Sequence, residues 1–282
     1  MHVSEPRLPV NYRGLHDNGT HCGGGIVSVE GTTASSPEEL VVSLEQANAL
    51  IDLIGMTEWA NALSSAMPVS GLISAGLVDS NGLTGDAEAI LGPARTVDSR
   101  LAIRLVSPRQ TLGVRSVRIW PSRPRSVVMR TEDDGVHFTQ VDDCDVPRIL
   151  AEESLLAPGP TIHDGPPSIS AEFVQAVRDV DLERAQSALI DVAAQGPSDS
   201  HFSQDCWHKR WSVVLCVREE RTPDGWKDTG HVECFITDHI HAQIHAPLDP
   251  RALALMRERN APTLDAPPRT ALWGFLMELL AK

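Results

Sequence analysis

The fold is decided by residues 100–141, which read RLAIRLVSPRQTLGVRSVRIWPSRPRSVVMRTEDDGVHFTQV. Apolar residues recur there at every second position, as in Leu101, Ile103 and Leu105, and this is the period of a β-strand with one buried face. Four such runs follow one another and are separated by short stretches rich in Pro, Ser, Asp and Gly. Strands that lie this close together and are joined by short turns predict an antiparallel meander.

Helical patterns precede this segment. A short apolar strand at residues 40–42 runs into a helix that Ser43 and Gln46 open as a capping box. A second helix is expected from Thr57, and a third, short helix is expected to end before residue 92. The N-terminal part of the chain therefore combines helices with the meander.

The same order of elements returns after a linker rich in Pro and Gly at residues 158–168. Ser170 is a good N-cap for the first of two helices, and three strands and two further helices follow them. The helices are expected from 170, over 182–194, from 249 and from 270, and the strands over 211–218, 231–237 and 242–246.

These patterns predict an α+β protein in which two halves share one sheet. The N-terminal half comprises residues 39–157 and the C-terminal half residues 169–282, and together they form one composite domain. Residues 1–38 have little apolar periodicity, so we expect an irregular extension there.

The composition excludes several classes of function. The 282 residues include 24 basic and 38 acidic side chains, which gives a net charge of −14. This balance argues against binding to nucleic acid or insertion into a membrane surface, because both require a basic face. No apolar run is long enough for a membrane span, the N-terminus lacks a signal-peptide pattern, and the five cysteines are scattered without a CxxC motif. We therefore expect a cytoplasmic protein with reduced thiols.

Charge is unevenly distributed along the meander. Residues 98–130 contain eight arginines and one acid, whereas residues 131–153 contain eight acids and one arginine. Neighbouring strands of opposite charge can pair across a sheet, so internal compensation is one interpretation. The other is that a polar face of the sheet binds an acidic or polar-tipped partner.

Two clusters are candidates for a catalytic or metal site. His239, His241 and His245 lie in the C-terminal strands and are the candidate ligands of a metal-dependent enzyme. No HExxH or CxxC spacing accompanies them, so half-exposed strand histidines explain the cluster better. Cys206 and His208 would share a face only in a strand, and no third group orients them. We therefore expect no catalysis and no cofactor or metal.

The arrangement resembles the EspG family, cytosolic chaperones associated with type VII (ESX) secretion in mycobacteria and their relatives. The resemblance covers residues 40–282 and departs from the family in the extension of residues 1–38. It is carried by the strand-to-helix opening at 40–55, AGLVDSNG at 75–82, ILGP at 90–93 before LAIR at 101–104, the turn at 134–136, the helix entry at 168–170 and LMELL at 276–280.

This resemblance implies a central, mostly antiparallel sheet flanked by two helical bundles with pseudo-twofold halves. It also implies a partner, a PE–PPE-type secreted heterodimer bound at the apolar tip of its PPE subunit, which the chaperone keeps soluble and export-competent. The family uses its sheet, its C-terminal bundle and the loop between its second and third strands, which is here residues 107–112. The implied partner-binding residues are Pro108, Arg109, Gln110 and Thr111.

Overall fold

A computed structural model describes residues 39–55, 69–155, 168–223, 225–256 and 261–281. Contacts divide the chain into two units, Met1–Ser35 and Ser36–Lys282, and every described element belongs to the second unit. The expected extension of residues 1–38, the helix expected from Thr57 and nearly all of the linker at 158–168 lie outside the described residues.

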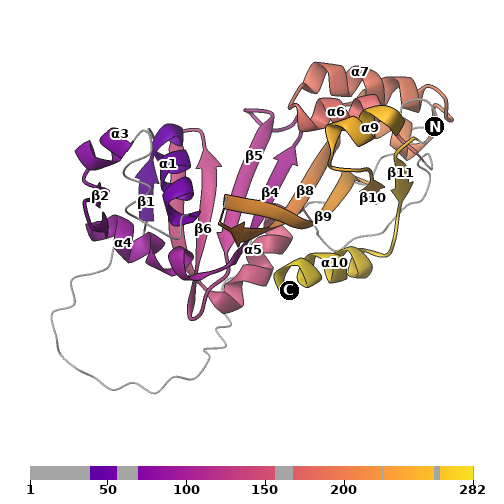
Figure 1. The fold of residues 1–282 in the computed structure, drawn as a ribbon. Helices are drawn as coiled ribbons and strands as arrows, with labels where there is room; N and C mark the ends of the chain where they lie inside the picture. The colour runs from indigo at the N-terminus through magenta and orange to yellow at the C-terminus, as the bar shows by residue number, and fades with distance from the viewer. Residues whose placement is uncertain (1–38, 56–68, 156–167, 224, 257–260, 282) are drawn as a thin grey trace, which may run out of the picture. The chain divides into compact units, whose positions relative to one another are not determined.

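The described residues form one nine-stranded sheet in which every neighbouring pair of strands is antiparallel (Figure 1). This confirms the α+β class and the large antiparallel sheet flanked by helices. In spatial order the strands are β1 (Glu39–Val42), β7 (Gly135–Asp142), β6 (Arg125–Glu132), β5 (Val114–Trp120), β4 (Ser99–Val106), β8 (Trp211–Thr222), β9 (Gly225–Thr237), β10 (His241–His245) and β11 (Thr263–Asp265); β2 (Val78–Asp79) and β3 (Gly82–Leu83) form a separate pair.

The strands of residues 100–141 are the predicted meander, β4 to β7, with consecutive antiparallel pairing. The C-terminal strands extend this sheet because β4 also pairs with β8, from Ser99 opposite Glu220 to Val106 opposite Val213. Strands from the two parts of the sequence therefore belong to one continuous sheet.

Several helices begin at residues that cap them. Ser43 Oγ accepts a hydrogen bond from the Gln46 amide at 3.2 Å and Gln46 Oε1 accepts one from the Ser43 amide at 3.0 Å, so the predicted capping box is confirmed. Ser170 likewise caps its helix through the Phe173 amide at 3.1 Å. The helices are α1 (Leu44–Gly55), α3 (Val69–Ser74), α4 (Gly85–Leu91), α5 (Val146–Glu153), α6 (Ala171–Arg178), α7 (Leu182–Ala193), α8 (His201–Trp207), α9 (Pro250–Met256) and α10 (Arg269–Ala281), with 3-10 turns at Gly92–Thr96 and Asp143–Asp145.

The two faces of the sheet are covered differently. On the face that we call the bundle face, α1, α3 and α4 pack on β6 and β7 through residues such as Met129 and Phe138, whereas α6 to α9 pack on β8 to β10 through residues such as Phe235. The opposite face packs against α5 and α10 around Ile103 and Ile119. The bundle face therefore carries one helical layer at each end and leaves its middle strands between them.

The structure differs from the expectations above in several elements. Helices α3 and α8 and strands β2, β3 and β11 were not predicted, and the β8–β9 hairpin continues to Thr222 and Gly225, beyond the strand limits expected at 218 and 231. Residues 219–230 are mostly polar and show no alternation, so the period of a strand cannot be recognised there although the backbone pairing continues. No helix in the described ranges is long and apolar enough to cross a bilayer.

Candidate partner-binding site

The β4–β5 loop, residues 107–113, contains the candidate site from the sequence, residues 107–112, and it is anchored at its first residue. Ser107 is buried, and its hydroxyl donates a hydrogen bond to the Trp211 carbonyl at 2.9 Å and accepts one from the Ser212 hydroxyl at 2.9 Å. The Ser107 amide in turn donates to the Gly113 carbonyl at 3.0 Å, which closes the loop. The rest of the loop, which includes the exposed Leu112, projects from a fixed base.

Arg109 is engaged inside the chain. Its two terminal nitrogens donate to the two carboxylate oxygens of Asp238 at 2.9 and 3.1 Å, a forked pair that we call the Arg109–Asp238 clasp. The hydrogen bond from Arg109 lowers the pKa of Asp238. Because Asp238 lies in the turn between β9 and β10, the clasp joins the loop to the second part of the chain.

The other candidate residues face a hollow. Gln110, Thr111 and Leu112 line a space of about 460 Å³ together with the β6–β7 turn, which contributes Glu132, Asp133 and Asp134. Pro108 is half-buried and does not line this hollow. The surface thus combines one exposed apolar side chain, an amide and a hydroxyl with an acidic rim, so it can contact an apolar group that has polar or basic neighbours.

Sequence reasoning missed the turn that forms the other wall of this hollow. The signal was present in the meander itself, because alternate hairpin turns of a meander lie at the same end of the sheet. The β4–β5 loop and the β6–β7 turn are separated by one hairpin, so both fall at that end.

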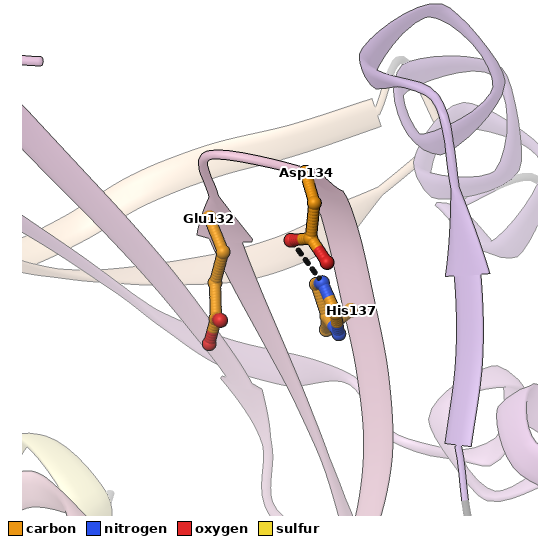
Figure 2. A group of neighbouring side chains, drawn as sticks. All are labelled: Glu132, Asp134 and His137. Carbon is orange, nitrogen blue, oxygen red and sulfur yellow. Dashed lines mark hydrogen bonds and ion pairs between the residues drawn. The ribbon is translucent and has the colours of Figure 1, made fainter.

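His137 lies next to this turn and contacts two carboxylates. Its Nε2 atom is 2.8 Å from Asp134 (Figure 2). Its Nδ1 atom is 2.9 Å from Glu39 of β1. Hydrogen bonds from His137 lower the pKa of Asp134, and the same contacts raise the pKa of His137. Glu132, Asp134 and His137 are the group of three in the described ranges whose ligand atoms lie within 4.8 Å of one another, the spacing that a metal ion would need.

The three histidines that are candidate metal ligands in the sequence lie in separate environments. His239 Nδ1 contacts the buried Asp205 of α8 at 2.9 Å, His241 is buried on β10, and His245 is exposed at the end of that strand. Their ligand atoms do not gather as those of the Glu132 group do.

Cys206 and His208 do not lie in a strand, the one arrangement in which they would share a face. Cys206 lies in α8, where side chains two residues apart point in different directions, and not in a strand. Burial raises the pKa of its thiol, which opposes formation of the thiolate that a nucleophile requires.

No family model and no curated protein sequence matches this chain. Among solved structures, the chain is similar to one in the structure of the Mycobacterium tuberculosis type VII secretion system chaperone EspG5 in complex with a PE25–PPE41 dimer. The match has a TM-score of 0.44 and 10% sequence identity, and it covers 86% of this chain and 95% of that chain. A likeness of this extent assigns neither a family nor a function to this chain.

Proposed function

We propose that this protein is a cytoplasmic chaperone of a type VII secretion system that binds a PE–PPE-type helical heterodimer and catalyses no reaction. The observation that carries the proposal is the architecture of the sheet. The family resemblance of the sequence implies an antiparallel sheet flanked by two helical bundles, and the bundle face carries one helical layer at each end. Residues 39–157 and 169–282 act in this proposal as one composite binding domain.

The β4–β5 loop is the proposed partner-binding site, with Pro108, Gln110 and Thr111 as contacts and Arg109 as the residue that positions the loop. Two features support it. Leu112 is 60% exposed at the tip of the loop, where it can meet the apolar end of a helical hairpin. Gln110 and Thr111 line the hollow beside it, where they can satisfy the unpaired carbonyls or amides at a helix end.

The clasp gives Arg109 an indirect role in this proposal. Its forked hydrogen bonds are already made to Asp238, so Arg109 holds the loop in position for the partner. Charge reversal at Arg109 places two acids side by side and moves the loop, whereas reversal of both residues restores an ion pair. Comparison of the single and double charge reversals therefore shows whether Arg109 positions the loop or touches the partner.

The proposal is tested by co-expression with a PE–PPE-type heterodimer from the same genome, followed by size-exclusion chromatography and isothermal titration. We expect a one-to-one complex. Leu112→Ser should weaken it about tenfold because the mutation removes a central apolar contact. Leu44→Ser is the matched control, since Leu44 is 58% exposed but lies on α1. Failure of every such heterodimer to bind would contradict the proposed function.

The role of the clasp is tested in the same assay. Arg109→Glu should weaken the complex by ~1–3 kcal/mol, and the double variant Arg109→Glu with Asp238→Arg should recover most of the affinity. If the double variant stays as weak as the single variant while circular dichroism shows an intact fold, Arg109 contacts the partner directly. Equal affinity of all three proteins would show that the clasp has no role in partner binding.

A further inference from the structure

The arginines of the basic stretch, residues 98–130, divide into two groups. Six of the eight form ion pairs with carboxylates, and internal compensation accounts for these six: Arg100 with Glu219, Arg109 with Asp238, Arg115 and Arg130 with Glu153, Arg123 with Asp143, and Arg125 with Asp142. The remaining two, Arg104 and Arg118, form no ion pair with any residue that the structure describes.

These two arginines line the same cleft. Arg104 on β4 lies opposite Ser116 of β5, and Arg118 on β5 lies opposite Ala102 of β4, so both side chains project from the bundle face. The cleft measures about 300 Å³. Its lining combines the middle strands β4, β5 and β8 with Arg178 of α6 and with Asp228 and Leu248. It therefore occupies the part of the bundle face between the two helical layers.

Arg118 has few partners for a partly buried cation. Its Nε atom is buried without a hydrogen bond in the described structure, and its Nη1 atom meets only the sulfur of Met129, at 4.0 Å. Burial lowers the pKa of Arg118 most, and the charges of Arg100 and Arg104 act in the same direction, whereas the charges of Glu219 and Asp52 oppose it. Several like charges beside a partly buried cation stabilise an anion that enters the cleft.

The acids in and around the cleft, of which Glu219 and Asp228 line it, form no ion pair with Arg104 or Arg118 in the part of the chain that the structure describes. Glu219 is paired with Arg100, and Glu233 accepts a hydrogen bond from Arg178 at 2.6 Å. Asp52 of α1 and Asp228 form no ion pair with a described residue, and burial raises the pKa of both. Among the described residues, Arg104 donates only to the backbone carbonyl of Arg178, at 3.2 Å. Neither guanidinium group therefore has a carboxylate partner within the described ranges.

We propose that this cleft binds the oxyanion of a small ligand, a carboxylate or a phosphate group, between Arg104 and Arg118. Two forked guanidinium groups match the geometry of such an anion, and the Ser116 hydroxyl is a further donor in the same lining. Leu215 and Val217 supply an apolar floor for the rest of the ligand. A volume of about 300 Å³ suits a small molecule and not a folded partner. This binding is independent of the proposed chaperone function.

The test is isothermal titration of the full chain with inorganic phosphate and, separately, with citrate at constant ionic strength. We expect saturable binding of at least one anion. Arg104→Gln and Arg118→Gln should each weaken it by about tenfold or more, because each removes a charge-assisted contact. Arg125→Gln is the matched control, since Arg125 belongs to the same basic stretch but does not line the cleft. Binding of phosphate alone, of citrate alone or of both identifies the oxyanion that the cleft accepts.

Two results would overturn the proposal. The first is that neither anion binds the wild-type chain saturably. The second is that Arg104→Gln binds as well as the control does, which would show that the anion binds elsewhere. Because Arg104 is exposed, its replacement leaves the core intact and decides the question even if Arg118→Gln fails to fold.

Discussion

His137 joins two separate parts of the meander edge, because its ring contacts Glu39 of β1 and Asp134 of the β6–β7 turn. The hydrogen bond to Asp134 raises the pKa of His137 most, and the bond to Glu39 adds to it. A protonated ring can donate to both carboxylates at once, whereas a neutral ring can donate to only one. The protonation state of His137 therefore affects the stability of the contact between β1 and the β6–β7 turn.

This linkage predicts a pH-dependent contribution to stability. The pKa of His137 in the folded protein is raised above the ordinary value near 6.5, so its contribution is fully present below about pH 6.5 and is lost as the pH rises through the folded value. We expect His137→Gln to lower the urea midpoint more at pH 5.5 than at pH 8.5. Midpoints are compared with those of wild type at each pH. An equal loss at both pH values would show that the ring contributes only by packing.

Among the elements, the β4–β5 loop depends on one glycine at its end. Gly113 has φ +72°, a conformation that side chains rarely adopt, and a Cβ atom there would lie 2.6 Å from Leu182 Cδ1 of α7. The loop therefore lies so close to the C-terminal helical layer that a Cβ atom at residue 113 would displace the end of the Leu182 side chain.

Gly113→Ala should lower the free energy of unfolding by ~1–3 kcal/mol through backbone strain and the contact with Leu182. Gly76→Ala is the matched control, because Gly76 has φ +70° but no atom within 4 Å of the added Cβ. Thermal unfolding of both variants separates the cost of backbone strain from the cost of the contact with Leu182. If Gly76→Ala costs as much as Gly113→Ala, the close approach to Leu182 adds nothing.

Local sequence patterns predicted most helices and strands. Contacts between residues that are far apart in the sequence could not be predicted from such patterns. The capping box at Ser43 and the alternation in β4 could be recognised within a few residues. Helix α8 was missed although Ser200 is its N-cap, because its seven residues are too few to establish a helical period. The Arg109–Asp238 clasp joins residues 129 positions apart, and no local pattern indicates such a pair. The family resemblance indicated the β4–β5 loop as a binding site but did not indicate the β6–β7 turn on the other side of the hollow.

For the whole molecule, the junction of β4 and β8 is the main link between the two parts of the sequence. The eight residues of β4 all pair with β8, and the core on the opposite face contains Ile103 and Ile119 from the first part together with Cys216 and Cys234 from the second. Separating the two parts would expose the edge of β4 on one part and the edge of β8 on the other. It would also expose the apolar residues of this shared core to water.

We therefore expect residues 36–282 to unfold in one cooperative transition. Differential scanning calorimetry should give a calorimetric enthalpy equal to the van't Hoff enthalpy. Residues 39–157 and 169–282, expressed separately, should each lack the cooperative melting of a folded domain. Two resolved transitions, or a separately folded half, would contradict a composite domain.

The edges of the sheet have a further consequence for the behaviour of the protein at high concentration. The outermost strands are short, with four residues in β1 and three in β11, whereas the strands in the middle are much longer. An exposed strand edge is a template for pairing with another chain, and its length sets how many hydrogen bonds such pairing can form. Two copies of the chain therefore gain little from joining their described sheet edges, which opposes the growth of fibrous aggregates.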